Sequence, residues 1–114
     1  MPLTPPSQRE HLHTRKVECR GFRRADGLWD VEGHIVDVKT YGFDNEWRGR
    51  VEPGQPVHDM WIRLTLDDDM AIVAVEAKTD ASPYQMCGDI APAYRKLLGL
   101  KVAPGFTRKT RELF

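Results

Sequence analysis

The segment of residues 75–87 (VEAKTDASPYQMC) holds the side chains best suited to chemistry in this sequence. Asp80, Tyr84 and Cys87 lie close together along it, and their carboxylate, phenol and thiol groups could line a polar pocket for a ligand. Asp, Ser and Pro are also the residue types of an ordinary turn, and cysteine is often buried without being reactive. The residues therefore allow a ligand site or a plain turn beside an inert thiol, and the turn is the simpler interpretation.

Three other residues could join Cys87 in a metal site: His34, His58 and Asp59. Thiolate, imidazole and carboxylate groups bind iron or zinc, and a tetrahedral site needs about four ligands. His58 and Asp59 are consecutive, and neighbouring residues of a strand point to opposite faces. We therefore expect His58 to be a solvated histidine and Asp59 to be an aspartate at the start of a strand, and not a pair of metal ligands. Iron or zinc is the expected cofactor only if a metal site forms around Cys87.

Asp30, Glu32 and His34 alternate along one strand-like run, so their side chains share one face. If that face lines a cleft, they could form a carboxylate and imidazole cluster for acid–base chemistry. The same alternation is typical of the exposed face of a half-solvated sheet, which is the preferred interpretation. Trp47 lies in a loop and Trp61 opposes an apolar face, so joint exposure of both would mark a ligand or partner surface.

The composition indicates a small globular protein without a general affinity for nucleic acid. The 114 residues are 40% hydrophobic and 30% charged, and 17 Lys and Arg balance 17 Asp and Glu. A chain of this length usually forms one domain, and zero net charge gives no overall field for nucleic acid or an anionic membrane. No apolar run approaches the roughly 18 residues of a membrane span. We expect a cytoplasmic protein in which Cys19 and Cys87 are reduced thiols.

Alternation of apolar and polar residues predicts a first hairpin after a proline-rich, disordered tail over residues 1–8. Residues 15–24 and 28–39 are its strands, and Asp26-Gly27 is predicted to form a type I′ turn between them. The remainder, residues 9–114, is expected to be one folded domain.

Two features of the return strand and its exit are notable. Trp29 is predicted to enter the core, and a phase change beside Gly33 indicates a β-bulge. Residues 40–56 are rich in Gly, Pro, Asn and Asp, which predicts a long connecting loop without structure of its own. Such loops are uncommon and are either functional or mobile.

Two more strands follow this loop. In the third strand apolar residues alternate strictly with others, which predicts these core side chains: Met60, Ile62, Leu64 and Leu66. A turn at residues 67–69 leads to a fourth strand, in which Val73, Val75 and Ala77 alternate with Ile72, Ala74 and Glu76. Four sequential strands form an antiparallel meander.

Two helices are predicted after Cys87. The first begins at an Asp89 cap and ends at Gly99, and its buried stripe is Ile90, Tyr94, Leu97 and Leu98. The second would present an apolar stripe for a protein partner: Phe106, Leu113 and Phe114. The predicted fold is thus α+β, an antiparallel meander of about four strands with two C-terminal helices packed on one face.

Four separated segments carry a family resemblance: residues 19–41, 56–69, 75–87 and 91–106. In this order they resemble an uncharacterised bacterial family catalogued as domain of unknown function 2889. The resemblance implies no established activity or catalytic residues. It does imply a further Gly-Cys-Thr-His-Leu segment and helix, so a C-terminally truncated chain is expected.

A second resemblance concerns the layout alone. A meander, then a cysteine at a helix start, is similar to iron–sulfur cluster scaffold proteins, and this would make Cys87 a metal ligand. From the residues we expect a small non-catalytic accessory or binding protein with its site around Asp80, Tyr84, Cys87 and Trp61. The alternatives are a metal- or sulfur-handling protein or enzyme using Cys87, and a fragment without activity of its own.

Overall fold

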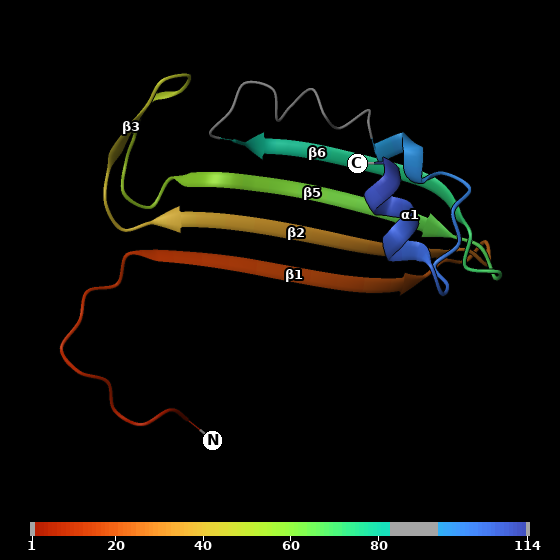
Figure 1. The fold of residues 1–114 in the computed structure, drawn as a ribbon, viewed down its shortest axis with the longest axis horizontal. Helices are drawn as coiled ribbons and strands as arrows, with labels where there is room; N and C mark the ends of the chain where they lie inside the picture. The colour runs from red at the N-terminus through yellow and green to blue at the C-terminus, as the bar shows by residue number, and fades with distance from the viewer. Residues whose placement is uncertain (1, 83–93, 114) are drawn as a thin grey trace.

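The structure, a computed structural model, describes residues 2–82 and 94–113, without the side chains of residues 106 and 107. Its main element is an antiparallel sheet in the order β1-β2-β5-β6 (Figure 1). The strands span His13–Arg23 (β1), Trp29–Lys39 (β2), Pro56–Leu66 (β5) and Ile72–Ala81 (β6). The predicted four-stranded antiparallel sheet is therefore confirmed.

The connection between β2 and β5 is not the unstructured loop that its composition predicts. It contains a second, two-stranded sheet of β3 (Phe43–Asn45) and β4 (Gly49–Val51). The Asn45 side chain accepts hydrogen bonds from the backbone N–H groups of Trp47 and Arg48 (3.0 and 2.9 Å) and so closes the turn. The Asn and Gly residues of this segment thus serve a short hairpin.

The two long hairpins of the sheet have the same loop geometry. The Arg24 N–H donates to the Leu28 carbonyl (2.8 Å), which leaves a three-residue loop that ends at Gly27 with φ +86°. A type I′ turn needs positive φ at Asp26 as well, and Asp26 lacks it, so the hairpin is confirmed and the predicted turn type is wrong. The loop between β5 and β6 repeats this geometry with Met70 (φ 64°) in the place of the glycine.

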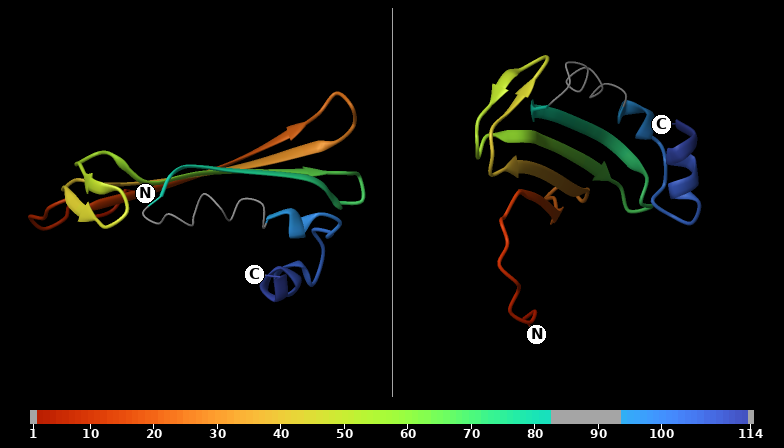
Figure 2. Two further views of the ribbon diagram at one scale, coloured as in Figure 1. Left: turned by 90° about the horizontal axis from the view of Figure 1, so that it is seen from above. Right: turned by 60° about the vertical axis from the view of Figure 1, so that its left-hand side comes forward.

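The cross-strand register divides the side chains between two faces. The core face consists of the rows Val17, Ile35, Met60 and Thr79; Cys19, Gly33, Ile62 and Ala77; and Gly21, Val31, Leu64 and Val75. The open face consists of the rows Glu18, His34, Trp61 and Lys78; Arg20, Glu32, Arg63 and Glu76; and Phe22, Asp30, Thr65 and Ala74. Leu97 packs with Leu66 and Ile72 at one end of the core face. The described C-terminal segment lies on that side of the sheet alone (Figure 2).

Among the described residues there is one α-helix, so the prediction of two C-terminal helices is wrong. Residues 94–97 form a single 3₁₀ turn, and α1 spans Phe106–Leu113. In the predicted first stripe Leu97 is buried, whereas Leu98 is 46% exposed. Ile90 and Phe114 lie outside the described residues. No helix in residues 2–82 and 94–113 combines the length and apolarity needed to cross a membrane.

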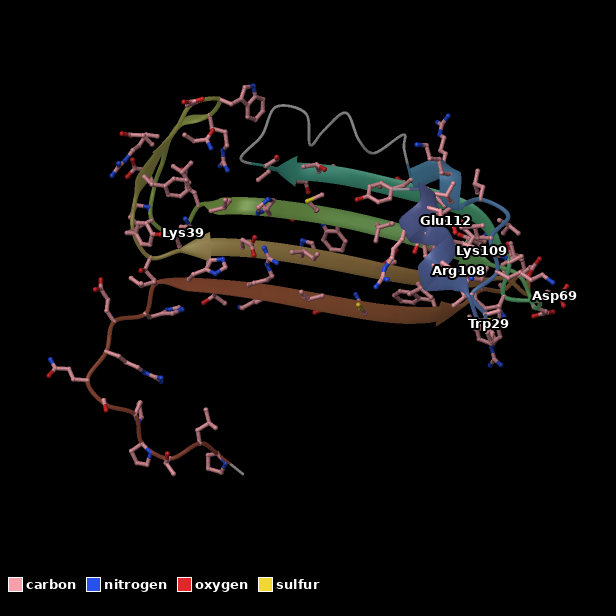
Figure 3. All side chains as sticks on the ribbon, viewed as in Figure 1. Trp29, Lys39, Asp69, Arg108, Lys109 and Glu112 are labelled. Atoms are coloured by element: carbon pink, nitrogen blue, oxygen red, sulfur yellow. The ribbon has the colours of Figure 1, made fainter. Side chains whose placement is uncertain are left out.

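Three details of strand packing differ from expectation. Gly33 lies in continuous register with both neighbours, so it is not a bulge; a Cβ there would lie 3.3 Å from Ile62 Cγ2, which explains the glycine. In β6 a register shift makes Val73 an extra residue, so Ile72 takes the core position (1% exposed) and Val73 is 46% exposed. Trp29 is 39% exposed and lies at the end of the sheet (Figure 3). Its Nε1 donates to Asp68 (3.3 Å).

Candidate functional site

A histidine, an aspartate and a tryptophan form a fixed group at the centre of the open face. His34 Nε2 and Asp59 Oδ1 are 2.6 Å apart, so the imidazole donates to the carboxylate. One face of the His34 ring stacks on the indole of Trp61; the ring centroids are 3.5 Å apart and the angle between the ring planes is 11°. Trp61 is 42% exposed, and no cation or second ring covers its other side within the described part of the chain. An indole is thus presented to solvent in one orientation.

Charged side chains line a shallow hollow of about 380 Å³ beside this indole. Its lining residues are Glu32, Trp61, Ile62, Arg63, Glu76, Lys78 and Asp80. Arg63 pairs with Glu32 (2.7 Å) and with Glu76 (3.4 Å), and Lys78 pairs with Asp80 (3.0 Å). The hydrogen bond that Arg63 donates to Glu32 raises the pKa of Arg63, and the hydrogen bond that Lys78 donates to Asp80 raises the pKa of Lys78. Both cations therefore remain charged, and the hollow carries alternating charges.

Asp80 reaches this hollow because β6 contains a second irregularity. Asp59 pairs with Ala81 and Met60 pairs with Thr79, so Asp80 is an extra residue between them. A bulge redirects a side chain locally, and here the carboxylate lies beside Lys78 on the open face. The structure therefore brings together Asp80 and Trp61, two of the four predicted ligand residues; Tyr84 and Cys87 lie outside the described residues.

The core face carries a second histidine and aspartate pair with different surroundings. The Asp37 side chain is 3% exposed and accepts two hydrogen bonds from the Arg15 guanidinium (2.7 and 3.0 Å). It also pairs with His58 Nδ1 (2.7 Å) and lies 3.6 Å from His13 Nε2. We call Asp37, Arg15, His58 and His13 the Asp37 cluster. The pKa of Asp37 is lowered, chiefly because its carboxylate accepts the hydrogen bonds from Arg15.

The Asp37 cluster was not predicted, although the sequence contains a signal for it. Asp37 follows Val31, Gly33 and Ile35 at the spacing of the core face, where a charged residue needs a partner. Arg15 and His58 occupy the matching core-face positions on β1 and β5. The change of phase in β2 thus reflects the replacement of apolar residues by a buried ion pair rather than a bulge at Gly33.

The acid–base and metal candidates of the sequence are brought together only in part: His34 pairs with Asp59, His58 lies on the other face, and Cys87 lies outside the described residues. His58 and Asp59 lie on opposite faces, as expected, and each pairs with a residue of β2. Asp30 accepts a hydrogen bond from Thr65 rather than from His34, and Glu32 pairs with Arg63. No cluster of three or more His, Cys, Asp or Glu residues suited to a metal ion occurs in residues 2–82 and 94–113.

Comparison with known protein families identifies a match that covers most of the chain. A family model described as a protein of unknown function (DUF2889) matches residues 13–114. That match begins at the first residue of β1 and includes every strand and the helix described above. No curated protein and no solved structure matches the chain.

Proposed function

Since the chain belongs to the DUF2889 family, whose description leaves its function open, we propose a function from the geometry of the open face. We propose that the protein is a small accessory binding domain that recognises a cationic group, above all a guanidinium, at Trp61. The group would stack on the free side of the indole, and carboxylates of the adjoining hollow would accept its hydrogen bonds. A partner protein's arginine side chain and a small guanidinium compound share this chemistry.

The observation that carries the proposal is the fixed exposure of Trp61. An exposed aromatic ring on a sheet gains little stability from its own position, yet this ring is held by His34, and His34 is held by Asp59. A preorganised ring loses little conformational entropy when a ligand stacks on it. Cations favour the face of Trp over the faces of Tyr and Phe. The arrangement therefore supports binding of a planar cation.

The charges around the indole support the same ligand. Glu32, Glu76 and Asp80 line the hollow against Arg63 and Lys78. The hollow thus has one more carboxylate than it has cations. The difference is two when Asp59 is counted, because Asp59 lies on the same face and binds the His34 ring that stacks on Trp61. Glu76 is the most available of them, with 74% of its side chain exposed. This balance favours a cation over a phosphate, so it does not support a nucleic-acid surface.

The test is isothermal titration calorimetry with a short peptide that carries one arginine and with the same peptide carrying citrulline, its neutral isostere. We expect the arginine peptide to bind at least about tenfold more tightly, since both the cation–π contact and the charge-assisted hydrogen bonds require the cation. Trp61→Ala should abolish binding, and Trp47→Ala is the matched control because Trp47 is also exposed (53%) but lies in the β3–β4 hairpin, outside the lining of the hollow. Equal affinities for both peptides, or binding that survives Trp61→Ala, would overturn the proposal.

Two further titrations distinguish the sources of the cation. Free arginine amide reports a small-molecule site, and a peptide with arginine flanked by other residues reports a protein site. If arginine amide binds as tightly as the peptide, the natural ligand is a small guanidinium compound. If the peptide binds more tightly, the flanking residues contact the open face and the ligand is a protein segment.

A further inference from the structure

Within residues 2–82 and 94–113, no strand pairs with the outer edge of β1, which is eleven residues long. β1 is an edge strand of the sheet, and it pairs with β2 without a register shift from His13 to Arg23. Every residue of β1 except Thr14 is exposed. The N-terminal segment leads away from the edge in Figure 1. Unpaired edge groups of this length are a template for another strand.

The other edge of the sheet is protected by features that β1 lacks. The Ile72 N–H donates to the Leu100 carbonyl (2.8 Å), and Gly99 N–H donates to the Ile72 carbonyl (2.7 Å), so the C-terminal segment occupies the start of the β6 edge. The two register shifts of β6, at Val73 and Asp80, interrupt its outer groups further. Bulges and covering segments are the usual protection of edge strands.

The hydrogen bonds of β1 establish which residues present backbone groups at the free edge. The Arg24 N–H donates to Leu28 and the Leu12 carbonyl accepts from Thr40, so even-numbered residues of the strand point their backbone groups toward β2. Antiparallel strands alternate between inward and outward groups. Val17, Cys19 and Gly21 therefore present N–H and C=O groups outward.

We propose that a second copy of this chain pairs with β1 in antiparallel register about a two-fold axis at Cys19. Cys19 then lies opposite Cys19 of the partner subunit, and Glu18 lies opposite Arg20 of the partner subunit, twice by symmetry. Lys16 lies opposite Phe22 of the partner subunit. The two sheets join into one, with their core faces on the same side because paired residues have the same parity.

Charge disfavours the two registers that lie one residue away. An axis at Glu18 would place Glu18 opposite Glu18 and Lys16 opposite Arg20, and an axis at Arg20 would place Arg20 opposite Arg20. Like charges directly opposite are destabilising, and opposite charges are stabilising. In the register centred on Cys19 Arg15 lies opposite Arg23 of the partner subunit, a like-charged pair that also occurs twice by symmetry. Both are already engaged within their own chain: Arg15 binds Asp37, and Arg23 lies 5.9 Å from the Trp29 ring centroid.

Sedimentation velocity of the full chain over a concentration series tests the dimer, with circular dichroism as the check on folding. We expect Glu18→Arg to weaken dimerisation at least about tenfold, because it creates two repulsive pairs. Adding Arg20→Glu to that variant exchanges the two charges and should restore dimerisation to near its original strength. Failure of the double variant to recover, while it remains folded, would exclude this register.

Two independent measurements examine the edge itself. In a Cys87→Ser background, a short bismaleimide should link two copies through Cys19, and Cys19→Ser should abolish the product. Val17→Pro removes an outward N–H and leaves the bonds to β2 intact, a place where a strand tolerates proline, so it should yield a folded monomer. A wild-type protein that stays monomeric at millimolar concentration, or a dimer that Val17→Pro leaves unchanged, would overturn the proposal.

Discussion

The two histidine and aspartate pairs of this sheet differ in nearly every respect except their composition. His58 and Asp37 lie on the core face, where Arg15 adds two hydrogen bonds and Asp37 is almost completely buried. His34 and Asp59 lie on the open face, about a quarter exposed, and their further contact is the stacked ring of Trp61. The first pair has its charge satisfied within the fold, whereas the second orients a solvent-exposed ring. The same residue types therefore serve stability on one face and are available for binding on the other.

The largest difference should be seen when each carboxylate is neutralised. Asp37→Asn weakens the charge-assisted bonds from Arg15 and leaves the buried site imperfectly satisfied, so we expect a loss of about 2 kcal/mol in the free energy of unfolding. Asp59→Asn should cost less than about 1 kcal/mol, because its pair is partly solvated. Urea denaturation of both variants measures the difference. Equal losses would show that the pairs are equivalent.

Acid should remove the contribution of Asp37. The pKa of Asp37 is lowered in the folded protein, chiefly by the hydrogen bond from Arg15. A carboxyl group of this kind stabilises the fold fully above its unfolded pKa, about 3.9, and the contribution is lost as the pH falls through the lower folded value. The stability difference between wild type and Asp37→Asn should therefore shrink as the pH falls below about 4. Urea denaturation at a series of pH values follows it, and a difference that grows in acid would contradict the assignment.

Replacing each histidine by glutamine separates stability from binding. Glutamine can still donate a hydrogen bond to Asp59, but it cannot stack on Trp61, so His34→Gln should lower affinity for the arginine peptide about tenfold with little change in stability. His58→Gln should instead cost about 1 kcal/mol of stability and leave affinity unchanged. Calorimetric titration measures the affinity of each variant for the arginine peptide, and thermal unfolding measures its stability. A loss of affinity in His58→Gln but not in His34→Gln would contradict the assignment of binding to the open face.

The smallest effect concerns the charge beside the open pair. Lys78 lies opposite Trp61 and pairs with Asp80, so it competes with an incoming cation. Lys78→Gln should raise affinity for the arginine peptide about threefold, an increment typical of exposed charges. Lys109→Gln, in α1 on the core-face side of the sheet, is the matched control for the loss of one positive charge. An equal gain in both variants would show that only net charge matters.

Much of the sheet could be predicted because its strands keep period two. Alternate residues of the run from Met60 to Leu66, beginning with Met60, lie on the core face as expected. The separation of His58 from Asp59 follows from the same alternation. The failures arise where one residue breaks the period. The bulge at Val73 moves Ile72 into the core, and neither residue has a chemical property that marks the shift.

The candidate site was only partly predictable for a related reason. The sequence predicts Trp61 and Asp80 as ligand residues, but the partners of His34 and His58 depend on the β2–β5 register, which the composition of the connecting residues 40–55 does not determine. The residues at 40–56 contain the Asn and Gly of a hairpin without the long alternating strands that usually identify one. A pairing set by side chains on different strands cannot be read from spacing along either strand alone.

The loops of the sheet have a consequence for how the chain folds. The β1–β2 and β5–β6 pairings close across three-residue loops, whereas the central β2–β5 pairing must close across residues 40–55. Local pairings cost less loop-closure entropy and form earlier than distant ones. The β3–β4 hairpin shortens the distance to be closed, and Arg48 of its turn donates to the Pro56 carbonyl at the start of β5 (2.8 Å). We therefore expect the two outer hairpins to form first and to dock late, so that both histidine and aspartate pairs, which bridge β2 and β5, form in that last step.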